Sequence, residues 1–162
     1  MPEAPAAAPQ SAPQSASLLA LDNQLCFSIY SAGLAFNRLY KPVLDAMNLT
    51  YPQYLVMMAL WETDAQTVGE LGERLFLESS TLTPLLKRLE ATGYVTRQRN
   101  PDDERQVQIR LTQRGRDLRE QALVCPSTVL QASGRSMDEL MKMKEATFAL
   151  RDAINAFNAA RG

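Results

Sequence analysis

The sequence predicts a mainly α-helical protein that carries one small β-hairpin. Three observations support this fold class. Apolar residues recur at helical spacing over most of the chain, two short segments alternate with period two, and a turn-forming segment joins these two. With 162 residues and 46% hydrophobic residues, the chain is long enough for a single domain with a substantial core.

The N-terminal tail differs in composition from the rest of the chain. Residues 1–17 are rich in Ala, Ser and Gln and hold four of the nine prolines. Such a segment buries too little apolar surface to offset the entropy lost on ordering, so we predict that it is disordered. It lacks a basic n-region and is not typical of a signal peptide. Residues 18–162 are then predicted to form one domain.

Residues 18–47 are predicted to form the first helix. Its apolar residues alternate in steps of four and three, the a/d spacing of a coiled-coil seam: Leu25, Ile29, Ala32, Phe36, Leu39 and Val43. Pro42 is expected to bend or shorten this helix near its end. Thr50-Tyr-Pro52 predicts the start of a second helix, which carries Tyr54 to Trp61.

A pair of shorter helices follows. Thr67 with Glu70 three residues later forms a capping box, which predicts a third helix over residues 68–75. The fourth helix begins at Ser79 or Ser80 and presents one apolar face, made by Leu82, Leu85, Leu86 and Leu89. We expect Gly93 to cap it and Pro84 to distort it locally.

The hairpin and two further helices complete the chain. Residues 95–99 and 106–111 are predicted strands, and residues 100–105 form the charged turn between them. Thr112 caps a fifth helix, whose apolar stripe includes Cys125 and which Pro126 is expected to interrupt. A last helix, from about residue 136 to 160, again has a/d spacing. Seam-like helices at both ends of the chain predict that the termini pair across a dimer.

The order of these elements is that of a winged helix-turn-helix. We assign residues 51–112 to this DNA-reading module and residues 18–50 and 113–162 to dimerisation helices. The second helix of the pair would lie in the major groove of double-stranded DNA. Its outward residues are the candidate DNA contacts: Ser80, Thr81, Thr83, Pro84, Lys87 and Arg88. Arg105 at the hairpin tip is predicted to enter a minor groove, with Asp103 holding it in place.

The local charge supports this interpretation. Residues 79–119 contain nine Lys or Arg against five Asp or Glu, a surplus of four, whereas the whole chain has a formal net charge of −1. Any nucleic-acid site must therefore be a local patch rather than a property of the whole molecule. The alternatives are a solvated charged face beside an ordinary hairpin, or a winged helix that binds only protein.

These residues carry a resemblance to a known family. Asp103-Glu-Arg105 followed by Leu111-Thr112 is similar to the wing motif of MarR-family regulators. Four further segments resemble one branch of that family, the organic-hydroperoxide-sensing or OhrR type. They are Leu25-Cys-Phe27, Tyr40-Lys-Pro42, Leu49-Thr-Tyr-Pro-Gln-Tyr54 and Thr81-Leu-Thr-Pro-Leu-Leu-Lys-Arg88. The resemblance covers about two thirds of the chain, from Leu21 to Thr112.

The resemblance implies a homodimeric repressor that leaves its palindromic operator when an organic hydroperoxide oxidises a reactive cysteine. That cysteine corresponds to Cys26, and its tyrosine partners correspond to Tyr30, Tyr40 and Tyr51. In part of the family a cysteine in the C-terminal half captures the sulfenic acid in an intersubunit disulfide. Cys125 fits this role by position and number, but an inert buried thiol on an apolar stripe fits equally well.

The surroundings of Cys26 limit how its thiolate can be stabilised. A peroxide sensor requires a thiolate, access for the oxidant and a group that captures the sulfenic acid. No Lys or Arg lies near Cys26 in the sequence, and Asp22 one turn earlier opposes ionisation, so tyrosine hydroxyls are the candidate donors. Tyr30 at i+4 is a helical neighbour. Tyr40 lies fourteen residues further on, roughly 21 Å along a helix, so it meets Cys26 only from a second copy or through a sharp break.

Composition excludes several other classes of function. The chain has no histidine, which excludes a Ser-His-Asp triad, a Cys-His pair and any His-ligated metal, so we expect neither a metal nor another cofactor. Two cysteines are too few for a secreted disulfide scaffold, and no apolar stretch is long enough to span a membrane. We therefore expect a cytoplasmic protein with no membrane partner.

Two other functions compete with the peroxide-responsive repressor. One is a MarR-type regulator released by a phenolic or other small ligand, in which Cys26 is structural. The other is a thiol peroxidase, which would leave the DNA module unexplained and for which no arginine lies near Cys26 to activate a peroxide. We therefore expect a regulator and not an enzyme.

Overall fold

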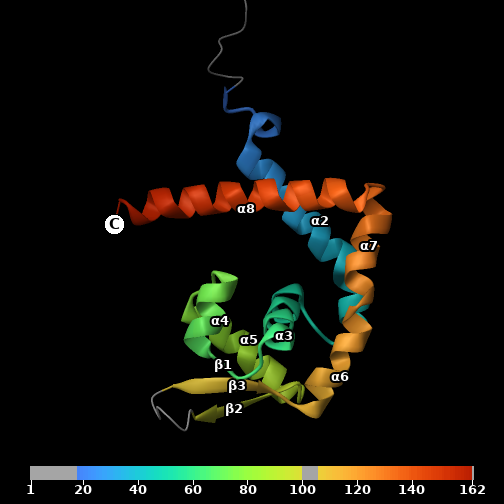
Figure 1. Ribbon diagram of the computed structural model, residues 1–162, viewed down its shortest axis with the longest axis vertical. Helices are drawn as coiled ribbons and strands as arrows, with labels where there is room; N and C mark the ends of the chain where they lie inside the picture. Colours follow the sequence, from blue (N-terminus) through green and yellow to red (C-terminus); the bar gives the residue numbers. More distant parts are fainter. Residues whose placement is uncertain (1–17, 100–105, 162) are drawn as a thin grey trace, which may run out of the picture. The chain divides into compact units, whose positions relative to one another are not determined.

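The computed structural model describes residues 18–99 and 106–161 (Figure 1). The predicted tail and the hairpin tip, which includes Asp103 and Arg105, lie outside the described residues. The chain divides into two compact units, residues 1–38 and residues 39–162, and each is described by itself. The prediction that residues 18–162 form one domain stays a prediction.

The first unit holds a 3₁₀ turn, η1 (Leu21–Asn23), and most of helix α2 (Leu25–Ala46). None of the residues from 18 to 38 is buried, although several are large and apolar: Leu25, Ile29, Leu34 and Phe36. Helix α2 continues past Pro42 into the second unit and ends four residues later, so it is not shortened at this proline, and the expected alternative, a bend, stays a prediction.

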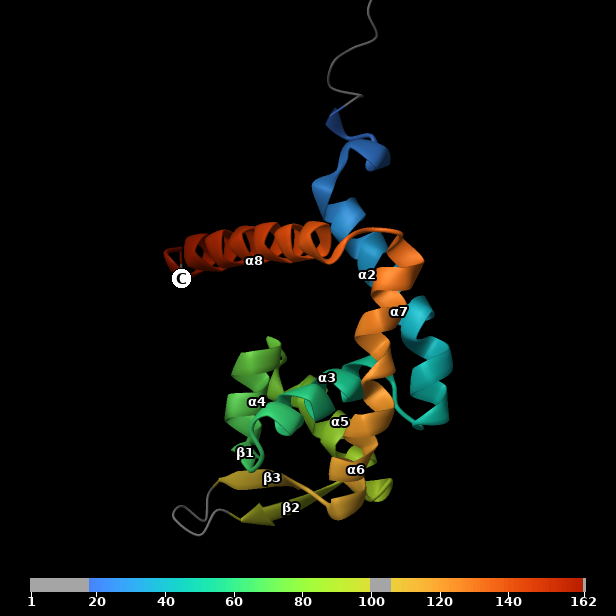
Figure 2. The same cartoon turned by 45° about the vertical axis from the view of Figure 1, so that its right-hand side comes forward.

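The second unit contains the helix-turn-helix and its wing. Its elements in chain order are α3 (Tyr51–Glu62), β1 (Gln66–Thr67), α4 (Val68–Leu75), α5 (Ser79–Ala91), β2 (Val95–Arg99), β3 (Val107–Leu111), α6 (Gln113–Ala122), α7 (Val124–Ser133) and α8 (Met137–Ala159). The strands form an antiparallel sheet in the order β1-β3-β2. The mainly α-helical fold with a small β wing is therefore confirmed (Figure 2).

Strand β1 is the element that sequence reasoning missed. It is only two residues long, and it pairs Gln66 with Ile109 and Thr67 with Gln108. A segment this short has no detectable period-two pattern. Because β1 ends directly before α4 and pairs with β3, it joins the base of the wing to the start of the helix-turn-helix.

The core of this unit lies between the helices and the wing. Leu82, Leu86 and Leu89 of α5 are fully buried, as the predicted apolar face requires, whereas Leu85 is half-buried. They belong to one cluster with side chains of α2 and the residue after it, α3, α4 and the wing: Leu44, Met47, Val56, Met57, Leu60, Leu71, Val95 and Ile109. Helix α5 is thus held by its inner face, and its outer face is exposed.

The predicted capping box at Thr67 and Glu70 is present, and two further boxes that the sequence analysis did not name lie at the starts of α3 and α8. Thr50 with Gln53, Thr67 with Glu70, and Ser136 with Glu139 each form a reciprocal capping box. Hydrogen bonds from Thr67 hold the pKa of the Glu70 carboxyl below its usual value.

The position expected for the break at Pro126 was wrong, whereas the local distortion expected at Pro84 stays a prediction. Helix α5 runs unbroken through Pro84 to Ala91. The fifth predicted helix does break, but at Leu123, three residues before Pro126. Pro126 lies instead in the first turn of α7, where its missing N–H leaves no hydrogen bond unmade.

Helix α8 has no buried residue, although large apolar side chains line it. Exposed examples are Met137, Met141, Met143, Phe148, Ile154 and Phe157. None of the helices within residues 18–99 and 106–161 is long and apolar enough to cross a membrane.

Candidate DNA-binding and redox site

The outer face of α5 is the candidate DNA-reading surface. Five of the six predicted contacts are exposed there: Ser80, Thr81, Pro84, Lys87 and Arg88. Thr83 is half-buried, and its hydroxyl donates a hydrogen bond of 2.7 Å to the Ser79 carbonyl. That bond satisfies its donor within the helix, so Thr83 is the least available of the six.

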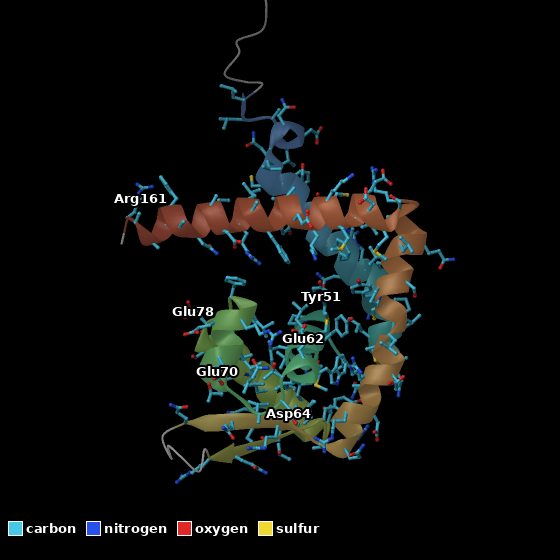
Figure 3. The ribbon with its side chains drawn as sticks, in the orientation of Figure 1. Tyr51, Glu62, Asp64, Glu70, Glu78 and Arg161 are labelled. Carbon is cyan, nitrogen blue, oxygen red and sulfur yellow. The ribbon has the colours of Figure 1, made fainter. Side chains whose placement is uncertain are left out.

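Polar contacts that the sequence did not reveal fix the wing against the helices. The Trp61 indole N–H donates to the Gly115 carbonyl at 2.8 Å, which joins α3 to α6. The Asp64 carboxylate, labelled in Figure 3, accepts from the backbone N–H groups of Ala65 at 2.7 Å and Leu111 at 2.8 Å. Asp64 follows Thr63, which caps the C-terminus of α3, and this position was the available signal for the Ala65 bond, because Asp often bonds nearby backbone N–H groups. Together these bonds hold the end of β3 and the start of α6 against the C-terminal end of α3.

Three tyrosines gather where α2 meets α3. The rings of Tyr40 and Tyr51 stack with centroids 5.9 Å apart, and Tyr54 lies 6.0 Å from Tyr40 and 6.3 Å from Tyr51. The structure therefore brings together two of the three tyrosines that the resemblance assigned. It adds Tyr54, whose place in the Tyr-Pro-Gln-Tyr segment puts it one turn after Tyr51 on the same helix.

Burial raises the pKa of the hydroxyl groups in this cluster, which are already protonated at physiological pH at their ordinary pKa of about 10. Desolvation, with smaller contributions from Tyr51 and Cys125, raises the pKa of Tyr40 to about 12. Burial also raises the pKa of Tyr51. These hydroxyls are therefore hydrogen-bond donors over the whole physiological pH range.

Cys125 belongs to the same cluster. It is fully buried in α7, and the Tyr54 hydroxyl donates a hydrogen bond to its sulfur. Desolvation raises the pKa of the Cys125 thiol, and the Tyr54 bond offsets this only in part. The thiolate is the reactive form of cysteine, so this environment keeps Cys125 unreactive as long as α7 covers it.

Cys26 and Tyr30 lie in the first unit, and both are exposed. They are one turn apart on α2, and the Tyr30 ring lies 6.5 Å from the ring of Phe27. The predicted redox residues are therefore divided between the units, with Cys26 and Tyr30 in one and Tyr40, Tyr51 and Cys125 in the other. Within the described ranges no cluster of three His, Cys, Asp or Glu could hold a metal ion.

Comparison with known proteins identifies the family. The sequence profile of the transcriptional regulators SarA/Rot matches residues 38–122. The chain belongs to this family of transcriptional regulators. It is 44% identical to the organic hydroperoxide resistance transcriptional regulator of Bacillus subtilis, over 86% of this chain and 95% of that one. It is also 49% identical to the regulator TtmR of Methylorubrum extorquens, over 85% and 70% of the two chains.

A solved relative has the same fold and is bound to DNA. Reduced AbfR bound to DNA has a TM-score of 0.70 and 36% identity, covering 86% of this chain and 98% of AbfR. Further structures of AbfR, which comes from Staphylococcus epidermidis, hold an overoxidised form bound to DNA and a disulfide form. The resemblance to the organic-hydroperoxide-sensing branch of MarR-type regulators is thus confirmed, and the relatives are regulators rather than enzymes.

Proposed function

We propose that this regulator is a redox-sensing repressor that releases its operator when an organic hydroperoxide oxidises Cys26. The observation that carries the proposal is the exposed thiol on α2 in a chain that is 44% identical to an organic hydroperoxide resistance regulator. Exposure gives the oxidant access to sulfur, which a peroxide sensor requires.

Tyrosine hydroxyls supply the donors of the peroxide pocket in this proposal. Tyr30 lies on the same face of α2 as Cys26, one turn away. Tyr40 and Tyr51 present protonated hydroxyls from one stacked pair. Because the sequence separates Cys26 from Tyr40 by fourteen residues of one helix, a second copy of the chain supplies the pair. The pocket is therefore shared between the two chains of a homodimer.

The homodimer also explains the exposed apolar residues at both ends of the chain. Leu25, Ile29 and Phe36 on α2, and Ile154 and Phe157 on α8, are large and exposed, an arrangement that is unfavourable in a monomer. A two-fold dimer presents two copies of α5, which read a palindrome with half-sites about one helical turn apart. We place Ser80, Thr81, Pro84, Lys87 and Arg88 against this DNA, with Thr83 contributing less, and Asp103 and Arg105 from the wing tip.

Two fates of the oxidised sulfur fit the proposal. Oxidation converts the Cys26 thiolate to a sulfenic acid and the hydroperoxide to an alcohol. A second thiol then attacks the sulfenic sulfur, which forms a disulfide and releases water. Cys125 of the other chain is the candidate if α7 moves to uncover it, and a small cellular thiol is the alternative.

A gel shift on the DNA upstream of the protein's own coding sequence tests the proposal. The wild-type protein should bind this DNA when reduced and release it after treatment with an organic hydroperoxide. Cys26→Ser should bind equally well and stay bound after the same treatment. Normal release by Cys26→Ser would falsify the assignment, and release by a phenolic compound would favour a ligand-controlled regulator.

A further inference from the structure

Phe76 occupies a position that is unusual for a phenylalanine. It caps the C-terminus of α4, directly after Leu75, and its backbone is left-handed with φ of 55°. Glycine or asparagine is common at such a cap, whereas a bulky side chain there is strained. Its ring is also 62% exposed, so core packing does not compensate for the strain. An exposed aromatic residue held in a strained conformation points to a contact outside its own helix.

The backbone of this turn is tightly fixed. The Leu77 N–H donates to the Gly72 carbonyl at 2.9 Å, and the Phe76 N–H donates to the Glu73 carbonyl at 3.3 Å. A Cβ added to Gly72 would lie 2.9 Å from the Leu77 carbonyl oxygen, so the chain crosses itself closely here. The direction in which the Phe76 ring projects is therefore set by the turn itself.

The Phe76 ring meets Arg151 of α8. The Arg151 guanidinium carbon lies 5.0 Å from the centre of the Phe76 ring and 4.4 Å from the centre of the Phe148 ring. The cation thus contacts one ring from the helix-turn-helix and one from α8, and both distances are typical of cation–π contacts. The Arg151 side chain remains 37% exposed and also pairs with Asp152. In both views of the chain α8 passes over the end of α4 (Figures 1 and 2).

We propose that Phe76 and Arg151 form a link through which α8 sets the orientation of the recognition helix. Leu71 of α4 and Leu82 of α5 are fully buried in the same cluster, so α4, the turn and α5 form one packed block. A contact that holds the turn therefore holds α5. Phe76 and Arg151 act as positioning residues, because they hold the reading helix without being on its outer face.

The consequence for function rests on the homodimer proposed above. If α8 joins the two chains, each chain's link fixes its α5 relative to the dimer axis. The two links together then set the distance between the reading helices and hence the half-site spacing that the dimer accepts. Loss of the link should leave recognition of one half-site intact while discrimination between spacings falls.

The test uses the full-length reduced protein and duplexes that the wild-type protein selects from a random pool. Each selected duplex is remade with its half-sites moved apart by one and by two base pairs. The measured quantity is the dissociation constant for the altered duplex divided by that for the selected duplex. Arg151→Gln should lower this ratio about five-fold or more, within the range of coupling between distant sites. Arg151→Lys, which keeps the cation, should retain most of the discrimination.

Two matched variants separate the link from general effects. Phe76→Gly removes the ring but relieves the left-handed strain, so it should keep or raise the melting temperature while losing spacing discrimination. Arg161 makes an equivalent contact, 5.2 Å from the Phe157 ring, entirely at the C-terminal end of α8 (Figure 3). Arg161→Gln should therefore behave as the wild type does.

Sedimentation of every variant shows which idea fails. If Arg151→Gln is a dimer with the spacing ratio of the wild type, the link is overturned and the repressor proposal stands. If Phe76→Gly loses stability in proportion to its loss of discrimination, the ring is structural and the link is again overturned. A wild-type protein that is monomeric and selects no palindrome refutes the homodimer and the link together.

Discussion

Replacing Gly115 by alanine should strongly destabilise the protein, because no space exists for a Cβ there. Gly115 is a buried residue in the first turn of α6, where that helix crosses the end of the turn before β2. A Cβ at this position would lie 2.0 Å from the Tyr94 carbonyl oxygen and 3.0 Å from the Tyr94 carbonyl carbon. Both are backbone atoms, so the clash is relieved only if α6 moves away by more than an ångström.

The cost follows from the contacts that such a movement breaks. The Tyr94 carbonyl accepts from the Thr112 N–H at 3.0 Å, and the Gly115 carbonyl accepts from the Trp61 indole at 2.8 Å. Losing both bonds costs about 2 kcal/mol, and overpacking costs about 1–3 kcal/mol more. The better helix propensity of alanine returns about 1 kcal/mol. The free energy of unfolding should therefore fall by about 2–4 kcal/mol.

Denaturant unfolding at one fixed protein concentration measures this change, since a dimer's stability depends on concentration. The matched control is Gly69→Ala in α4, where the nearest atom to an added Cβ is the Thr67 hydroxyl oxygen at 3.9 Å. This variant should be unchanged or slightly stabilised. If Gly115→Ala unfolds within about 0.5 kcal/mol of the wild type, as a surface change would, the packing argument is wrong.

The remaining predictions concern the site. Tyr40→Phe should slow peroxide oxidation of Cys26, followed by mass spectrometry, without weakening DNA binding. Because folding raises the Tyr40 pKa to about 12, its contribution to stability is complete below pH 10 and is lost as pH rises towards 12, so this variant should unfold less steeply with pH over that range. Arg105→Ala should weaken operator binding, because each chain loses one cation that contacts a phosphate. The slope of the logarithm of the binding constant against the logarithm of salt concentration should therefore fall in magnitude by about 2 per dimer. An unchanged slope would contradict a wing-tip contact. Cys125→Ser should abolish a dimer-mass band on non-reducing electrophoresis after one equivalent of hydroperoxide, whereas a monomer with a small-thiol adduct on Cys26 would show that Cys125 does not resolve.

Elements with a local chemical signal were predictable from sequence, and elements that depend on tertiary contacts were not. Thr67 and Glu70 satisfy each other's neighbouring backbone groups within one turn, so the start of α4 could be located without a fold. Strand β1 and the Asp64 bond to Leu111 depend on partners more than forty residues away, at Ile109 and Leu111. Pro126 was misplaced as a breaker because proline is tolerated in a first turn, and only the fold shows that α7 begins at Val124.

The tyrosine cluster shows the same division. The resemblance pointed to Tyr40 and Tyr51 by their sequence context, and the structure stacks them. The sequence offered no reason to place Cys125 against Tyr54, because that contact joins α7 to α3 across about seventy residues. The sequence therefore pointed to two tyrosines that lie together in the structure, but not to the surroundings of the second thiol.

The different environments of the two thiols determine the order of oxidation in the proposed mechanism. Peroxide attacks a thiolate that it can reach, and burial both covers the Cys125 sulfur and raises its pKa. Cys26 is exposed, so it is oxidised first. For Cys125 to attack the sulfenic sulfur, its Tyr54 hydrogen bond must break and α7 must leave the cluster. The helix is already interrupted at Leu123, directly before this segment, so the chain can hinge there without unwinding α6. A disulfide at Cys125 would take the Cys125 sulfur away from Tyr54 and the tyrosines stacked beside it. In the proposed mechanism, capture of the sulfenic acid and disruption of the reduced peroxide pocket therefore occur together.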